Sequence, residues 1–257
     1  MNGEMLQAVS DVIAIEYCRK TNVILPATTE HHPIREFYFL DGRQTEDYEK
    51  WVKWVNDDGI RKMILYPNLP KIIERRKELG FLRAFIVIMP VFHANGEMTF
   101  WQNRWDYLKE ENRWKIVSRE QAWENGPKEL IAFPGKPEIQ AMVQPLQAAM
   151  QLCDQIGEPG WKRVFENSIA MLQQEDYDFR GPKAQKYFER YLGILPEQNL
   201  RLLSAAANAF VFGAMGTWND GPAGKAAEAG LEKEYNQISD MLAAGCIMNL
   251  TYAVNRW

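Results

Sequence analysis

The sequence has few of the residues that enzymes most often use for catalysis and metal binding, with three histidines and three cysteines in 257 residues. Cys18, Cys153 and Cys246 are far apart and have neither the paired spacing of a disulfide framework nor that of a zinc site. Each lies among apolar neighbours, so we expect buried, reduced thiols, which are typical of a cytoplasmic protein.

Several sequence signals of function are also missing. There is no Walker loop, dinucleotide fingerprint or nucleophile elbow. No apolar run approaches the roughly 18–20 residues of a membrane span, and the N-terminal residues lack the pattern of a secretory signal. The net charge of −4 argues against nucleic acid or an anionic membrane as a partner. We therefore expect a cytoplasmic protein without a cofactor or a metal.

The composition that remains is typical of a globular protein, with 46% hydrophobic and 25% charged residues. It changes at residues 133–137, where two prolines and a glycine interrupt any helix or central strand. Aromatic and β-branched residues dominate before this point, and Ala, Leu, Gln, Glu and Met dominate after it. The sequence predicts an α+β protein with an N-terminal unit over residues 1–133 and a helical unit over residues 138–257.

The first half of the N-terminal unit gives mixed signals. Residues 9–17 fit a strand or a short helix, and residues 22–25 and 34–40 read as strands. Thr45 can cap a helix that ends near Asn56, and Pro70 opens a second predicted helix over residues 71–79.

A three-stranded antiparallel meander follows, and its middle strand carries many aromatic residues. Residues 82–92 form an apolar run, Asn95-Gly96 favours a type I′ turn, and residues 97–108 return before a further turn leads into residues 114–118. Period-two alternation places Trp101 and Trp105 on one face and Arg104 and Asp106 on the other. Since both faces carry large apolar groups, we expect a central strand that is covered on both sides.

The segment from Asn95 to Val117, NGEMTFWQNRWDYLKEENRWKIV, resembles the closing hairpin of cystatin-like α+β sheets, including those of the nuclear-transport-factor-2-like superfamily. The resemblance implies a pocket between sheet and helices, which an enzyme or a small-molecule-binding protein would use. Its candidate residues are His93, Trp101, Arg104, Trp105 and Asp106.

Amphipathic helical patterns fill the C-terminal unit. We expect helices over residues 138–156, 160–174, 182–192, 196–212 and 224–255, with a kink at Pro145. Ala243-Ala244-Gly245 permits close approach of a neighbouring helix.

The glycine-rich stretch Phe210–Gly224 separates the last two helical patterns. Gly213 and Gly216 are expected to end or bend the chain. Trp218 then plugs the core with its N–H bonded to a carbonyl, and Asn219 or Asp220 caps the next helix. The functional alternative is a recognition knob formed by these three residues.

The loop that reads QQEDYDFRG is a second candidate binding segment. Tyr177, Phe179 and Arg180 are residue types that are enriched at interface hot spots. The structural alternative is a loop that caps the helical core.

Histidines give little support for catalysis or metal binding. Glu30, His31 and His32 are adjacent, and a third ligand would have to come from elsewhere, so we read them as a polar loop. His93 precedes the predicted turn and would need Glu97 or Asp106 as a partner to act as a general base.

The segment FVFGAMGTWND and the helix that follows it resemble an FGGMGSWND-type element of small uncharacterised bacterial proteins, some of which are grouped with toxin-immunity-like proteins. The resemblance extends from Ala205 to Leu250, with departures at Ala214 and Thr217. It implies bacterial origin and a compact helical end, and it supplies no catalytic residue. The sequence thus favours a non-enzymatic cytoplasmic binding protein of accessory or toxin-immunity type. Its partner would be a toxin-like protein or a second copy of the chain.

Overall fold

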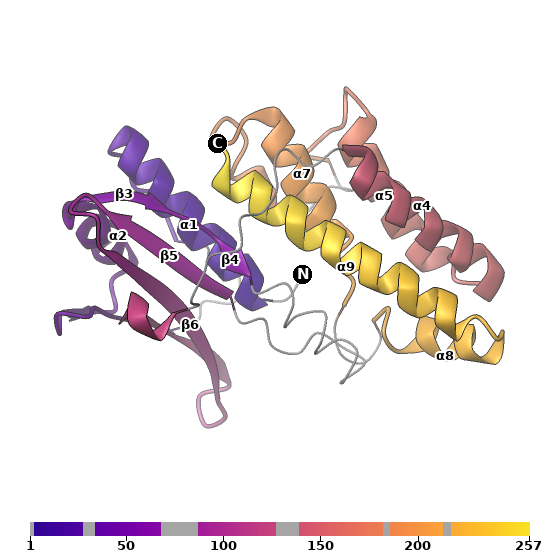
Figure 1. Ribbon diagram of the computed structural model, residues 1–257, viewed down its shortest axis with the longest axis horizontal. Helices are drawn as coiled ribbons and strands as arrows, with labels where there is room; N and C mark the ends of the chain where they lie inside the picture. The colour runs from indigo at the N-terminus through magenta and orange to yellow at the C-terminus, as the bar shows by residue number, and fades with distance from the viewer. Residues whose placement is uncertain (1–2, 28–33, 68–86, 127–138, 182–185, 213–216) are drawn as a thin grey trace. The chain divides into compact units, whose positions relative to one another are not determined.

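The computed structural model describes residues 3–27, 34–67, 87–126, 139–181, 186–212 and 217–257 (Figure 1). The chain divides into two compact units. The sheet unit contains the described residues up to Gly126, and the helical unit contains those from Ile139 onward. The predicted α+β class, with a sheet followed by helices, is confirmed. The predicted boundary at residues 133–137 lies outside the described residues.

The sheet unit contains a seven-stranded sheet with the order β2-β1-β7-β6-β5-β3, and β4 also pairs with β5. Its pairs are antiparallel except that of β1 with β7, which is parallel. The meander β5–β6–β7 is confirmed, with β6 in the interior of the sheet. The strands are β1 (Ile34–Tyr38), β2 (Gln44–Thr45), β3 (Ile60–Met63), β4 (Tyr66–Pro67), β5 (Val87–His93), β6 (Met98–Leu108) and β7 (Arg113–Ala122), and a 3-10 turn, η1 (Trp123–Asn125), follows.

The turn between β5 and β6 differs from the predicted type I′ turn. Such a turn needs a positive φ at both central residues. Of the two central residues, only Gly96 has a positive φ, at 88°. The Gly96 N–H donates to His93 O over 3.1 Å. The Asn95 side chain instead accepts from Glu97 N–H over 3.0 Å, so this asparagine stabilises the turn through its amide.

Helix α1 (Gly3–Thr21) includes residues 9–17, for which the sequence pattern fits either a strand or a short helix. It packs against β3, β5 and β6, and its residues 7–16 are all buried, which explains why no one-sided apolar pattern marks it. The strand predicted at residues 22–25 is wrong. The chain leaves the helix through Asn22, which has a φ of 58°.

Helix α2 (Tyr48–Asp57) begins two residues later than the predicted cap implies. Asp47 is the N-cap, since its side chain accepts from Lys50 N–H over 3.0 Å. Thr45 belongs to β2, and its hydroxyl oxygen accepts from Asp47 N–H. The predicted helix over residues 71–79 and the first part of the run at residues 82–86 lie outside the described residues.

The long helices of the helical unit form a closed ring of contacts. Helix α4 touches α5, α5 touches α7, α7 touches α9, and α9 touches α4. A Cβ placed on Gly245 of α9 would lie 3.4 Å from Met142 Sδ of α4, so the predicted close approach is confirmed. The helices are α4 (Ile139–Ile156), α5 (Pro159–Gln173), α6 (Lys186–Glu189), α7 (Glu197–Asn208), α8 (Gly221–Glu228) and α9 (Glu232–Asn255).

The single final helix predicted over residues 224–255 is wrong. Gly230, with a φ of 73°, ends α8, and α9 starts anew. Leu231 N–H donates to Ala226 O over 2.7 Å, and Gly230 N–H donates to Ala227 O over 3.0 Å. These two bonds form a Schellman motif, which requires the left-handed residue that glycine supplies.

Candidate functional site

The β6–β7 hairpin ends in an arm that extends beyond its described neighbours. Toward this end of the hairpin, the last residue of β7 that pairs with β1 is Lys115, and the last residue of β6 that pairs with β5 is Gln102. The hairpin itself continues to the pairs Tyr107–Trp114 and Leu108–Arg113. Figure 1 shows this end of the hairpin projecting from the sheet. We call residues 104–114 the aromatic arm.

Three aromatic rings gather on one face of the arm. The ring of Trp114 lies 5.1 Å from that of Tyr107 and 5.9 Å from that of Trp105, between centroids. Trp114 is 43% exposed and Tyr107 is 45% exposed. The Tyr107 hydroxyl donates to Asn112 Oδ1, which ties the tip to its own turn. Among the described residues, the buried Trp105 Nε1 has no hydrogen-bond acceptor.

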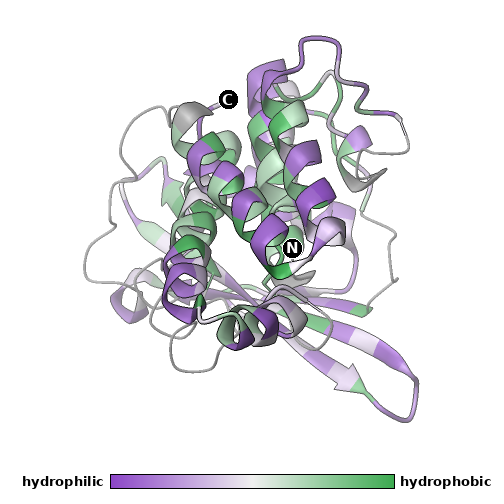
Figure 2. Ribbon diagram, turned by 90° about the vertical axis from the view of Figure 1, so that its right-hand side faces the viewer, coloured by the Kyte–Doolittle hydropathy of each residue, from purple (hydrophilic) through white to green (hydrophobic). Residues whose placement is uncertain are grey.

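Four of the six charged residues of the arm form two ion pairs within it. Arg104 Nε lies 3.1 Å from Asp106 Oδ1, and Arg113 Nε lies 2.7 Å from Glu111 Oε2. Arg104, Asp106 and Arg113 lie on the face of the arm opposite the rings, and Glu111 lies in its turn. Along the projecting hairpin of Figure 2, purple hydrophilic residues alternate with near-white ones. Partly exposed Tyr and Trp side chains are enriched in protein-binding patches.

The structure does not bring the predicted pocket residues together. Trp101 is 1% exposed and packs edge-on against Trp51 and Phe39, with centroid distances of 5.5 and 5.0 Å. Trp105 belongs to the aromatic arm, while Arg104 and Asp106 lie on the other face of β6.

His93 lies at the turn end of β5, in a short polar chain. Its Nε2 lies 2.9 Å from Thr99 Oγ1, and the Thr99 hydroxyl donates to Glu120 Oε1 over 2.8 Å. Glu120 Oε2 also accepts from Leu40 N–H over 3.1 Å. In this arrangement the threonine donates to the carboxylate and not to the histidine. A nucleophile activated by histidine needs the opposite arrangement.

Trp218 lies in the core of the helical unit and has no exposed surface. Its Nε1–H donates to Ser239 Oγ over 2.9 Å, and its carbonyl accepts from the Tyr235 hydroxyl over 3.0 Å. The N–H thus bonds a hydroxyl, where a carbonyl was expected. Phe165 meets the indole edge-on, with centroids 5.2 Å apart.

The other residues of this corner lie closer to the surface. Asp220 is exposed at the N-cap position of α8, and Asn219 is half-buried. Gly213 and Gly216, which were expected to bend the chain, lie outside the described residues. Trp218 therefore fills the core of the helical unit, and Asp220 lies at the start of α8.

The predicted QQEDYDFRG segment begins with the last residue of α5 and continues as a loop. Tyr177 donates to Asn167 Oδ1 over 3.0 Å, and burial raises the pKa of its phenol. Phe179 is buried against Tyr177, while Arg180 is exposed. Arg201 of α7 supports the loop by donating to Gln174 O and Glu175 O, both over 2.6 Å.

A groove of about 600 Å³ runs along α5 beside this loop. Tyr177 is the one predicted residue in its lining. Phe179 and Arg180 are therefore parts of the loop but not of the groove. The lining comprises Gly160, Arg163, Val164, Glu166, Asn167, Ala170, Gln174, Tyr177 and Asn208.

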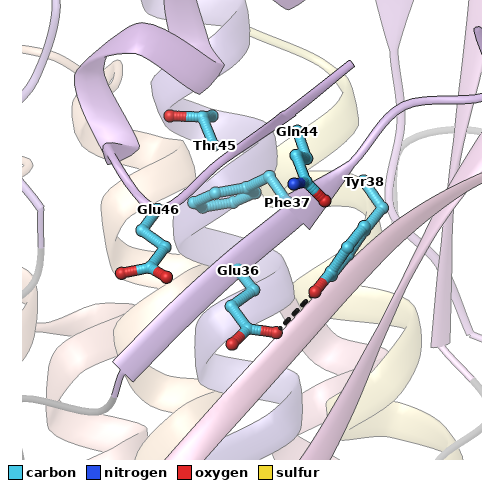
Figure 3. A pocket seen from close by; sticks show the side chains of 6 residues that line it. All are labelled: Glu36, Phe37, Tyr38, Gln44, Thr45 and Glu46. Carbon is cyan, nitrogen blue, oxygen red and sulfur yellow. Dashed lines mark hydrogen bonds between the residues drawn. The ribbon is translucent and has the colours of Figure 1, made fainter. Parts of the chain in front are cut away.

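A smaller cavity of about 270 Å³ lies at the β1–β2 edge, where Glu36 and Glu46 flank the opening (Figure 3). Lys115 Nζ lies 2.6 Å from Glu36 Oε1, and the Tyr38 hydroxyl donates to the same carboxylate over 2.8 Å. The hydrogen bond from Lys115 lowers the pKa of Glu36. Because Lys115 already neutralises Glu36, this carboxylate offers little charge to a ligand, and Glu46 is the other acid of the lining.

Sequence reasoning missed two buried ion pairs of the sheet unit. Arg35 donates to both carboxylate oxygens of the fully buried Asp11 over 2.9 Å, and Asn103 Nδ2 donates to Asp11 Oδ2 over 3.1 Å. Glu16, also fully buried, pairs with Arg19 over 2.8 Å and Lys62 over 3.3 Å. Acidic residues in the middle of an apolar helical run were the available signal, since such residues are almost never fully buried without a partner.

Chemistry that needs a reactive thiol has little support. The three cysteines are free and buried, and burial raises the pKa of the Cys153 thiol to about 12. Thiolate is the reactive form, so such a group is inert at neutral pH. In the part of the chain that the structure describes, no cluster of histidine, cysteine and acidic residues could hold a metal ion. The Glu30-His31-His32 segment lies outside that part.

Comparison with protein-family models, curated proteins and solved structures finds no match for this chain. Within the described ranges, no helix is both long and apolar enough to cross a membrane.

Proposed function

We propose that the protein is a non-enzymatic bacterial binding protein that contacts a protein partner through the aromatic arm. One observation carries this proposal: Tyr107 and Trp114 lie in ring contact and are each more than two-fifths exposed at the end of a projecting hairpin. Tyrosine and tryptophan dominate interface hot spots because they bury large rigid surfaces at little cost in conformational entropy.

The partner that fits best is a basic protein, as in the accessory or toxin-immunity type that the C-terminal resemblance implies. The chain carries a net charge of −4, which speeds the approach of a positively charged partner. The arm carries three basic and three acidic residues, four of them in local ion pairs, so the arm supplies contact area and the rest of the chain supplies the attraction. Buried free cysteines support a reducing, cytoplasmic setting.

The test is quantitative affinity capture in the organism that carries the gene. The tagged wild type is compared with an arm variant, Tyr107→Ser with Trp114→Ser, and with a control, Val23→Ser with Leu40→Ser. The control removes two apolar side chains that are somewhat more exposed, at 51% and 55%, elsewhere in the sheet unit. We expect one basic protein at near-stoichiometric yield with the wild type and the control, and at least a tenfold loss with the arm variant.

Two results would overturn the proposal. One is equal recovery of the same partner by the arm variant and the wild type. The other is the absence of any stoichiometric partner, including the case in which the chain captures only further copies of itself.

A further inference from the structure

A groove at the turn end of the sheet unit is separate from the aromatic arm. Its volume is about 490 Å³, within the range of sites for small molecules. It belongs to β3, the end of β5 and the start of β6. The lining residues are Arg61, Lys62, Phe92, His93, Gly96, Glu97 and Met98.

Strand register builds an apolar floor for this groove. Lys62 of β3 pairs with Phe92 of β5, and Phe92 pairs with Met98 of β6. Residues that pair across neighbouring strands point to the same face of a sheet. Phe92 and Met98 are both half-buried, so they offer a partly exposed apolar surface beside the lysine.

A shift of register explains why two consecutive basic residues line one groove. Ile60 pairs with His93 and Lys62 pairs with Phe92, which leaves Arg61 as an extra residue between two consecutive partners. In a regular strand, neighbouring side chains point to opposite faces. A bulge breaks this alternation and re-aims a side chain, so Arg61 joins Lys62 at the groove.

Positive charge exceeds negative charge around this site. The Lys62 ammonium lies 3.3 Å from Glu16, but that carboxylate is already paired with Arg19 over 2.8 Å. Burial and the nearby Lys62 lower the pKa of Lys20, as expected where cations crowd together. Arg61 is exposed and has no carboxylate partner among the described residues. The acid of the groove itself, Glu97, accepts from Asn95 Nδ2 over 2.8 Å.

We infer that this groove binds a small amphipathic carboxylate. The apolar body of the ligand lies on Phe92 and Met98, and its carboxylate pairs with the Arg61 guanidinium, which offers two parallel N–H donors. The positive charge of Lys62 adds to this attraction. This inference is independent of the proposed partner contact.

Octanoate is a suitable probe, and the methyl resonance of Met98 in the full-length protein is a local readout. We expect a saturable shift of that resonance with weak affinity, in the high-micromolar to millimolar range for a ligand of this size. Octylammonium has the same chain with the opposite charge and is expected to leave the resonance unchanged. Absence of a saturable shift with octanoate, or an equal response to octylammonium, overturns the inference.

Three charge variants locate the carboxylate. Arg61→Gln removes the proposed partner and is expected to weaken octanoate binding about tenfold. Glu97→Gln removes a like charge from the rim and is expected to tighten binding about twofold. Lys53→Gln, a matched loss of an exposed cation on α2, is expected to change nothing. The inference is wrong if Arg61→Gln and Lys53→Gln have the same effect, or if Glu97→Gln weakens binding. Circular dichroism confirms that each variant is folded.

Discussion

The two units of this protein differ in the kind of polar residue that each one buries. In the described residues of the sheet unit, two fully buried acids, Asp11 and Glu16, are matched by Arg35, Arg19 and Lys62. The buried polar residues described in the helical unit are all neutral, and they are Ser168, Asn199, Ser204, Ser239, Asn249 and Thr251.

The difference follows from how each unit fixes its elements. Asp11 of α1 bonds to Arg35 on β1 and Asn103 on β6, so one carboxylate holds the helix in register over separate strands. The helices of the other unit are positioned by side-chain packing. Gly245 lets Met142 approach closely, and Trp218 packs against Phe165. A buried ion pair requires specific partners, whereas packing requires only a matching volume.

The largest expected effect is at Trp218. Replacing it with Ala removes a fully buried indole and strands the Ser239 hydroxyl, so we expect a loss of about 5 kcal/mol in the free energy of unfolding. Urea denaturation gives the loss, and hydrogen exchange places it in α5 and α9. Trp114→Ala on the arm is the matched control and is expected to cost less than about 0.5 kcal/mol. Similar losses for the two variants would contradict the core role of Trp218.

The second effect tests the ionic core of the sheet unit. Asp11→Ala leaves the Arg35 guanidinium buried without its carboxylate, and we expect a loss of about 4 kcal/mol. Hydrogen exchange should increase in α1 and β1 while α9 stays protected. The double variant Asp11→Leu with Arg35→Met removes both charges and is expected to recover most of the loss. If the double variant is no more stable than Asp11→Ala, a buried unpaired charge is not the cause of the stability that Asp11→Ala loses.

The smallest effect is a pH dependence confined to the sheet unit. Lys115 lowers the pKa of Glu36, so this pair stabilises the fold above the unfolded-state pKa of about 4.3, and the contribution is lost as pH falls through the folded-state value. Glu36→Gln is therefore expected to be slightly less stable than the wild type at pH 7, with a smaller difference than in either case above. Denaturation at pH 7 and at pH 2.5 compares the two. A difference that persists unchanged in acid would exclude the ion pair as its source.

The sequence predicted those parts of the fold that depend on local signals. The β5–β6–β7 meander follows from alternation and a turn between apolar runs, and α4, α5 and α7 follow from helical periodicity. Helix α1 was ambiguous because its residues 7–16 are all buried, which removes the one-sided pattern that marks a helix. The break at Gly230 was missed because a single glycine can lie within a helix or end it.

The candidate site was less predictable because it depends on pairing between distant residues. Trp101 and Trp105 share a face, as alternation predicts. Trp51 packs against Trp101 and buries it, whereas Trp105 lies further along β6, on the arm. The contact of Tyr107 with Trp114 follows from the hairpin register, because β7 begins at Arg113 and not at Trp114, where the sequence places the start of the strand. The position of Arg61 could not be predicted either, since a bulge arises from strand pairing and leaves no mark on the sequence of one strand.

We propose that a partner binds at the aromatic arm and not at the Trp218 corner. A photo-crosslinking benzophenone residue at position 107 compared with one at position 220 tests it directly, because both positions are exposed. We expect a covalent adduct with one protein from position 107 and none from position 220. An adduct from position 220 alone, or none from position 107, would contradict it.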